Sequence, residues 1–570
     1  MNINQKIFSI LSASQKKKFA FVSVLNLIST VLELLGLALI FPVVSILVNY
    51  EKFINIFKDY DYFNLLNINE QKQVIIFIMI ILATFFLIKG IFSILINYIK
   101  SRIFFSLIAS ITSTMFKGYL NQGVAFLQKE NSAYITRKII EHPIIFVHHV
   151  LQSYYNIIFD TFLILGAFSI FFIANKTVGI LISVGVICFI LGFYFFNKNK
   201  TREYGKSLNH RFNERLKTTR EVIEGINDIN LYKKNKFFEN LFEDHNYKIA
   251  SLTSILAIRE LLPKVILEFL AVFTVSALII FFISNGLSGE EIVPIISLVA
   301  AGLIRINPSA SKILSSLQRI KSSTPSTDDL YNEIQKFRKI DKNKDIKFNF
   351  SNRLTLKNVS FSFDENKVFE NLNFEINNKS IFGIKGKSGS GKSTLINLII
   401  GFYNPDSGKI MADDTEILDN ISNWQNLIGY VPQKIFLTDD TLEKNIAFGV
   451  EEDDIKFDKL DNVIKHSQLN EFISDREFGL KTKIGERGKQ ISAGQVQRIG
   501  IARALYKNPK ILIFDEATSA LDKKTEKKII EDVVNLKNKG ITVILVSHEP
   551  SVLEYCDTFY DLDENKYIKN

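Results

Sequence analysis

The sequence predicts two domains of different fold class: an all-α transmembrane domain of six helices, followed by an α/β domain built around a phosphate-binding loop. Apolar runs of membrane-spanning length recur from about residue 18 to 320 and are absent after about 350. The later part instead alternates short apolar strands with helices, and one strand leads into a glycine-rich loop. We therefore expect a membrane domain at 1–320, a linker at 321–350 and the α/β domain at 351–570.

Composition excludes several other classes of protein. The 570 residues are too many for one ordinary core, and 47% hydrophobic residues with only 27 Gly and 10 Pro exclude a disordered or collagenous chain. The two cysteines, Cys188 and Cys556, indicate neither a disulfide scaffold nor a Cys-based metal site. We assign the net charge of +10 to cytoplasmic loops, and so expect membrane lipids but no nucleic acid as partners.

Six stretches have the length and apolarity of membrane spans. They are Phe19–Val48, Val74–Ile99, Tyr155–Ala174, Val178–Phe196, Val265–Ile283 and Ile292–Pro308. Lys16, Lys17 and Lys18 precede the first span, and the connection at 197–264 is rich in Lys and Arg. Positive charge collects on the cytoplasmic side, so we expect a multi-pass protein of the inner (plasma) membrane with both termini in the cytoplasm.

The two inner connections, at 100–144 and 197–263, are long, helical in periodicity and nearly free of Gly and Pro. We expect spans two to five to continue into the cytoplasm, with a short turn or transverse helix at each tip, at Ser132–Ile135 and Glu221–Tyr232. The alternative is solvated amphipathic helices without a contact role. After the sixth span, Lys321–Thr327 is predicted to be a turn, Asp328–Lys339 a helix and Lys342–Asn349 a polar connector.

A phosphate-binding loop follows the predicted strand Ile381–Ile384 and precedes the predicted helix Thr394–Ile400. Its glycines let backbone N–H groups surround phosphates, and the helix N-terminus adds a positive dipole. Lys392 is expected to bridge the β- and γ-phosphates of ATP, and the Ser393 hydroxyl to bind Mg²⁺. The expected ATP-binding residues of this loop are Gly386, Lys387, Ser388, Gly389, Ser390, Gly391, Lys392, Ser393 and Thr394.

Two carboxylates end a second apolar strand, Ile511–Phe514. Because such strands present their carboxyl ends at one edge of a sheet, Asp515 is placed to bind Mg²⁺ and Glu516 to polarise the attacking water. The alternative is an acidic pair that only caps a helix.

Further polar residues stand where other elements begin or end. Ser492 and Gln495 have the spacing of a capping box at the start of a helix at 493–506. Gln433 follows the strand Ile428–Val431, and His548 follows a strand at 541–547.

This ordered set resembles the nucleotide-binding domain of ABC transporters, and the whole chain resembles a type IV exporter half-transporter. The resemblance implies a Q-loop at Gln433 that also reaches Mg²⁺, a D-loop at Asp522 and a catalytic switch at His548 beside the catalytic Glu516. It also implies that a second copy of the chain completes each ATP site through the signature Ser492, Ala493, Gly494 and Gln495. Two positions depart from the family pattern: Ala493 replaces a usual Gly, and Phe363 replaces the Tyr that often stacks on adenine.

Charged residues within the spans suggest what is moved, because charges are costly in a bilayer. Glu33, Lys89, Lys264, Glu268 and Arg305 fall in the middle or cytoplasmic half of their spans. They either pair with one another, or Lys89, Lys264 and Arg305 form a basic lining for an anionic lipid headgroup.

The stretches Phe85–Asn97, Leu262–Leu270 and Leu303–Ile313 resemble bacterial lipid-linked oligosaccharide flippases, in which basic cavity residues handle the lipid pyrophosphate. The resemblance favours Lys89, Lys264 and Arg305 as substrate-binding residues. A lipid A, multidrug or peptide exporter is the alternative, and an ATP-gated channel or regulator is a further one. The segment Glu51–Asn69 is expected to be an interfacial helix or a packed loop.

Overall fold

The computed structural model describes residues 3–39, 43–44, 46–47, 71–286, 289–338, 350–485, 491–516 and 523–569. The chain divides into two compact units. The first comprises Met1–Gln122 and Leu127–Ile340, and the second comprises Gly123–Phe126 and Asp341–Asn570. We call them the membrane unit and the nucleotide-binding unit. The predicted interfacial segment Glu51–Asn69 and the connector Lys342–Asn349 lie outside the described residues.

The described residues of the membrane unit form helices and the turns between them, without strands. Among the described residues, six helices are long and apolar enough to cross a membrane, in agreement with the six predicted spans. The helices of this unit are α1 (Ile3–Ile10), α2 (Ala13–Ala38), α6 (Gln71–Leu120), α8 (Ser132–Ile145), η1 (Phe146–Leu151), α9 (Gln152–Ala174), α10 (Lys176–Glu224), α11 (Ile226–Leu231), α12 (Asn235–Ser284), α13 (Gly289–Ser322) and α14 (Thr324–Arg338). A further short helix, α7 (Val124–Lys129), falls across the division between the two units.

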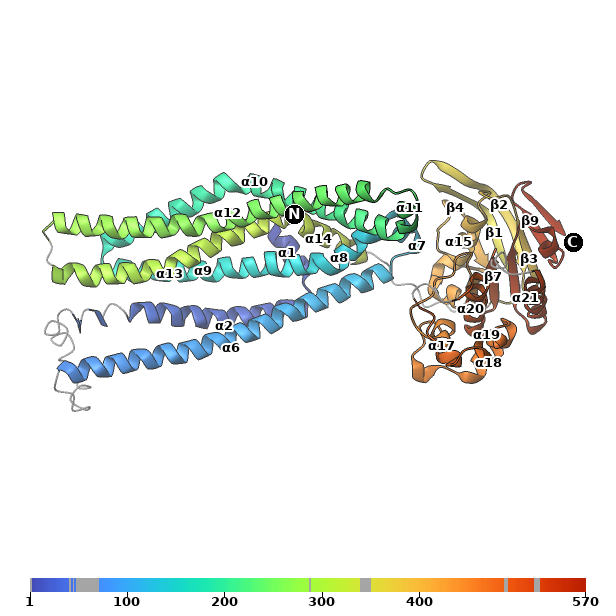
Figure 1. Ribbon diagram of the computed structural model, residues 1–570, viewed down its shortest axis with the longest axis horizontal. Coiled ribbons are helices and arrows are strands. Elements are labelled where there is room, and N and C mark those ends of the chain that lie inside the picture. The colour runs from blue at the N-terminus through green and yellow to red at the C-terminus, as the bar shows by residue number, and fades with distance from the viewer. Residues whose placement is uncertain are drawn as a thin grey trace. The chain divides into compact units, whose positions relative to one another are not determined.

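The long helices pack in two groups (Figure 1). α2 lies beside α6, and α9, α10, α12 and α13 pack together around an apolar core. α6, α10 and α12 have 50, 49 and 50 residues, so each is about 75 Å long and extends well beyond a hydrocarbon layer of ~30 Å. This confirms that spans two, four and five continue past the membrane. Pro263 lies within α12 near its middle, where it has no backbone N–H to donate, and the helix continues through it.

Two predicted turns of this unit are wrong, and one is confirmed. Ser132–Ile135 is the first turn of α8, because Asn131 caps that helix with its side chain; the chain turns earlier, after Leu120. Lys321–Thr327 is almost wholly helical, since Pro325 stands at the start of α14, where a helix tolerates proline. The prediction at Glu221–Tyr232 is confirmed, because the chain turns there through the short helix α11.

The nucleotide-binding unit holds two sheets. A six-stranded sheet has the order β10-β9-β3-β8-β7-β6, in which β9, β3, β8, β7 and β6 run parallel. Its strands are β3 (Ile381–Lys385), β6 (Ile428–Val431), β7 (Ile511–Asp515), β8 (Thr542–Val546), β9 (Thr558–Asp561) and β10 (Lys566–Lys569). An antiparallel sheet has the order β2-β1-β4-β5, with β1 (Arg353–Phe363), β2 (Asn366–Asn377), β4 (Ser407–Ala412) and β5 (Thr415–Glu416).

The parallel sheet separates two apolar clusters, because alternate residues of its strands face one or the other, and helices complete each cluster. The phosphate-loop helix α15 (Lys392–Ile400) packs in one apolar cluster with β1, β2 and the single Trp424. The helix α20 (Ala493–Tyr506) packs in a second cluster with α17 (Leu442–Ile446), α18 (Phe457–His466) and α21 (Lys523–Asn535). The loop for phosphates and the capped start of α20 therefore belong to different halves of the unit.

Candidate functional site

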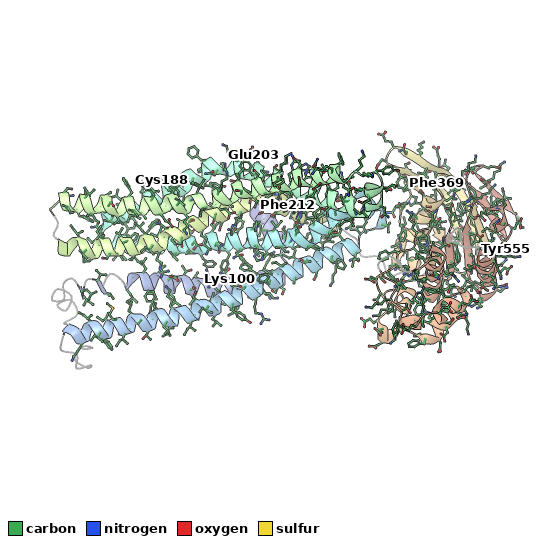
Figure 2. The ribbon with its side chains drawn as sticks, viewed as in Figure 1. Lys100, Cys188, Glu203, Phe212, Phe369 and Tyr555 are labelled. Carbon is green, nitrogen blue, oxygen red and sulfur yellow. The ribbon has the colours of Figure 1, made fainter. Side chains whose placement is uncertain are left out.

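The phosphate-binding loop takes the conformation that its glycines permit. Gly389 and Gly391 have φ of 86° and 93°, which favours glycine. A Cβ at Gly391 would approach the ring of Phe369, labelled in Figure 2, to 2.7 Å. Lys392 is buried, and its Nζ donates to the carbonyls of Gly386 (2.8 Å) and Lys387 (3.0 Å). The lysine thus lies folded over the loop whose backbone N–H groups would surround the phosphates.

Three other predicted residues follow three neighbouring parallel strands and so lie at the carboxyl edge of the sheet. β7 lies between β6 and β8, so Gln433 after β6 and His548 after β8 flank Glu516, which follows β7. Glu516 Oε2 accepts from Gln433 Nε2 at 2.9 Å. Its Oε1 lies 3.3 Å from Lys392 Nζ and 3.8 Å from His548 Nδ1. Three residues that were chosen from the sequence therefore meet at the carboxylate of a fourth, Glu516.

Asp515 lies deeper than Glu516 and has different partners. It is buried, accepts from the Tyr430 hydroxyl at 3.2 Å and is hydrogen-bonded by Ser393. Burial, together with the charge of Glu516, raises the pKa of Asp515, although its hydrogen bonds and Lys392 act in the opposite direction. Tyr430 was missed from the sequence; its position in β6, three residues before Gln433, is the signal that could have found it.

These residues fit Mg²⁺ and ATP. Ser393 and Asp515 supply hard oxygen donors side by side, and Mg²⁺ commonly takes one or two protein oxygens and completes its shell with phosphates and water. In the described part of the chain, no group of three or more His, Cys, Asp or Glu side chains is arranged to hold a metal ion by itself. Among the described residues, the buried Ser390 hydroxyl has no hydrogen-bond partner, so it can still accept or donate a bond to a bound group.

The remaining predicted ATP-site residues lie on other elements. Ser492 caps α20 with both bonds of the predicted capping box: Gln495 N donates to Ser492 Oγ (3.3 Å), and Ser492 N donates to Gln495 Oε1 (2.9 Å). Ala493 and Gly494 form the first turn of this helix. Phe363 ends β1, and its half-exposed ring stands edge-on to Phe361 and Tyr403. Asp522 lies outside the described residues.

The intramembrane charges of α2, α6 and α13 are paired. Glu33 Oε2 lies 2.7 Å from Lys89 Nζ and 3.3 Å from Arg305 Nη1. Lys264 Nζ lies 4.0 Å from Glu268 on the same helix, and both of these side chains are exposed. Lys89 and Arg305 thus meet at one carboxylate, whereas Lys264 lies elsewhere.

Two open cavities with charged side chains in their lining are found in the described part of the membrane unit. One, of about 320 Å³, is lined by Glu33, Arg305, Lys100, Lys312 and Asp160 among others; Lys100 on α6 is labelled in Figure 2. The other, of about 510 Å³, is lined by Lys264, Glu268, Lys312 and Arg319 among others. Lys312 lies 3.3 Å from Asp160 and borders both cavities. Five bases and three acids line the two cavities; since Arg319 is also paired with Glu260 at 2.8 Å, bases exceed acids by one.

Lys100, Lys312 and Arg319 were missed from the sequence. Lys312 comes seven residues after Arg305, two turns along the same helix face. That spacing could have shown from the sequence that Lys312 lies on the same side of α13 as Arg305.

Comparison with known proteins agrees with this geometry. A family model described as "ABC transporter" matches residues 369–519. The chain is 41% identical over 186 residues to Multidrug resistance protein 1 of Entamoeba histolytica, but this match spans only 32% of the chain and 14% of that protein. It is 24% identical to an ATP-dependent lipid A-core flippase of Francisella novicida over 88% of the chain and 86% of the flippase.

The fold of the whole chain is also found among solved structures. A bacterial Atm1-family ABC exporter with ATP bound superimposes with a TM-score of 0.76 and 20% sequence identity, over 98% of this chain and 95% of that one. The chain therefore carries an ABC transporter domain that binds ATP, its six long apolar helices indicate a multi-pass membrane protein, and its fold is that of the Atm1-family exporter structure.

Proposed function

We propose that the chain is an ATP-driven translocase that moves an anionic glycolipid, such as a lipid-linked oligosaccharide, from the inner to the outer leaflet of the plasma membrane. The observation that carries the cargo proposal is the lining of the two cavities: Arg319 is paired with Glu260 at 2.8 Å, and the other four Lys or Arg side chains still outnumber the three carboxylates. An uncompensated positive charge in a membrane domain is costly unless an anion balances it. A phosphate or pyrophosphate headgroup would supply that anion.

We assign ATP hydrolysis to the edge of the parallel sheet. Lys392 would leave the loop carbonyls for the phosphates, and Ser393, Asp515 and Gln433 would hold Mg²⁺, which neutralises developing charge on the phosphates. Glu516 would then orient and deprotonate the attacking water, with His548 beside it. The network that now joins Glu516 to Lys392, Gln433 and His548 supports this assignment, because each partner is already within reach of the reacting groups.

We infer a homodimer. The signature residues at the start of α20 pack in a different half of the unit from the phosphate loop, so a second copy would bring its α20 to face this loop. The positive dipole and bare N–H groups of that helix start suit the outer phosphates. A protein that hydrolyses ATP at full rate as an isolated monomer in a nanodisc would contradict this inference.

A lipid A-type glycolipid is the second candidate cargo, favoured by the flippase of Francisella novicida that matches over 86% of its length. Proteoliposomes loaded with labelled lipid-linked oligosaccharide or with lipid A would separate the two candidates, with ion conductance as the control for a channel. We expect ATP-dependent flipping of one of these lipids without conductance. Transport of neither, or an ATP-dependent current, would overturn the cargo proposal.

A further inference from the structure

The last hairpin of the chain lies against the beginning of the phosphate-binding loop. β9 pairs in parallel with β3, and the register places Asp561 beside Lys385, the last residue of β3. The pairing continues beyond the strand, because Leu562 N donates to the Lys385 carbonyl at 2.9 Å. The turn between β9 and β10 is therefore held next to Gly386, where the phosphate-binding loop starts.

Of two carboxylates in this turn, Asp561 binds the end of β3 and Asp563 binds the start of the loop. Asp561 is 2% exposed; its Oδ2 accepts from Lys385 Nζ at 2.8 Å, and its Oδ1 accepts from the N–H of Asp563 at 3.0 Å. The Asp563 carboxylate accepts from the backbone N–H of Lys387, with distances of 3.0 and 3.3 Å to its two oxygens. Asp561 thus fixes the turn, and Asp563 extends from the turn to the loop.

The segment Gly386–Lys387 is consequently held from two sides. Its carbonyls accept from Lys392 Nζ, the group expected to move to the β- and γ-phosphates, and the Lys387 N–H donates to Asp563. When Lys392 moves to a nucleotide, the contacts of the hairpin are the ones that keep this segment in place.

We propose that Asp563 is a positioning residue for the phosphate-binding loop: by accepting from the Lys387 N–H, it keeps the loop in its binding conformation and so strengthens ATP binding. This inference rests on the proposed ATP site. It concerns affinity and not the chemical step, because Asp563 reaches a backbone amide and is not among the groups assigned to Mg²⁺ or the attacking water.

A competing effect has the opposite sign, which makes the proposal testable. A negative charge beside a phosphate site repels ATP, so if Asp563 acted only through its charge, removing that charge would tighten binding. If the hydrogen bond dominates, removing the acceptor weakens binding, whereas Asp563→Asn retains an acceptor oxygen at the same place.

The test uses the full chain in nanodiscs and measures three quantities: the Kd of a fluorescent ATP analogue without turnover, KM and kcat for ATP, and the melting temperature. For Asp563→Ala we expect Kd and KM to rise about tenfold with kcat within about twofold, as for the loss of one hydrogen bond to a charged group. Asp563→Asn should bind within about threefold of wild type, because its acceptor oxygen remains. Glu564→Ala, which removes the neighbouring exposed carboxylate, is the matched control and should behave as wild type.

Wild-type or tighter binding by Asp563→Ala would overturn the inference, as would an Asn variant that binds as weakly as the Ala variant. Should the Ala variant fail to fold, Asp563→Leu, which also lacks an acceptor at that place, takes its position in the test and should show the same rise in Kd and KM. A wild-type chain that binds no nucleotide would instead overturn the proposed function itself, a result that the wild-type titration reveals separately.

Discussion

Glu516 in the nucleotide-binding unit and Glu33 in the membrane unit each gather side chains from separate segments, but their surroundings differ. Glu516 holds Lys392, Gln433 and His548 at an open sheet edge, where a ligand can take over its partners. Glu33 holds Lys89 and Arg305 between helices, where Lys89 is almost fully enclosed. The partners of Glu516 can therefore be replaced by a bound ligand. In the membrane unit, by contrast, two bases stabilise the single carboxylate of Glu33, which water does not fully solvate.

The largest effect is expected at the exchangeable network. Glu516→Gln should lower ATP turnover by about 10²–10⁴-fold, because it removes the proposed general base while leaving Lys392, Ser393 and Asp515, the proposed ligands of Mg²⁺ and ATP. Steady-state ATPase and nucleotide-binding assays check this prediction. Glu549→Gln, at an exposed carboxylate next to His548, is the control. Wild-type turnover of Glu516→Gln would move the catalytic role elsewhere.

Replacing the bases that pair with Glu33 in the membrane unit should lower the stability of the protein. Replacing both Lys89 and Arg305 by Gln leaves Glu33 without its bases, and breaking a buried pair costs about 3–5 kcal/mol. We therefore expect a lowered melting temperature for the double variant in detergent. Adding Glu33→Gln should restore it, and the triple variant then allows flipping to be measured on a well-folded protein. A double variant that melts like wild type would show that the pairing contributes little.

A smaller effect concerns Asp515 and pH. Its folded-state pKa is raised above the ordinary 3.8, chiefly by burial, so the folded form binds the proton more tightly than the unfolded chain does. The ligand-free protein should therefore lose stability as pH rises through the interval above 3.8. Asp515→Asn should remove this loss and raise the melting temperature at pH 7 in EDTA by a few degrees. A lower melting temperature for the variant would contradict the sign.

The smallest effect is expected at Phe363. If its ring stacks on adenine, Phe363→Ala should weaken ATP binding by about 2–10-fold, as for an aromatic contact of 0.5–1.5 kcal/mol, whereas Phe363→Tyr should stay within about twofold. Titration with a fluorescent ATP analogue measures both variants. Unchanged affinity of the Ala variant would place the base elsewhere.

The sequence alone was enough to predict that Lys392, Gln433, Glu516 and His548 lie close together. Each of them stands at the beginning or end of an apolar element, and parallel strands bring such positions to one edge of the sheet. Tyr430 and Asp563 escaped prediction because their contacts depend on which strands become neighbours, β6 with β7 and β3 with β9. Strand order cannot be read from local pattern.

In the membrane unit, helix length was predictable from apolar periodicity, but the contacts between helices were not. The pairing of Glu33 with both Lys89 and Arg305 depends on the relative rotation of α2, α6 and α13, which spacing leaves open. The first turn was misplaced although Gly123 and the cap Asn131 were both visible in the sequence, because helical periodicity continued on either side of them.

Pro263 gives α12 a mechanical property. It removes one backbone donor near the middle of a helix of 50 residues, leaving arms of roughly 40 Å and 30 Å on its two sides. A stiff rod with one weakened point behaves as a lever, so a few degrees of bending at Pro263 would displace the far end of either arm by several ångströms. A force on the end of α12 next to α11 would thus change the tilt of the arm on the other side of Pro263, without any change in the packing of either arm.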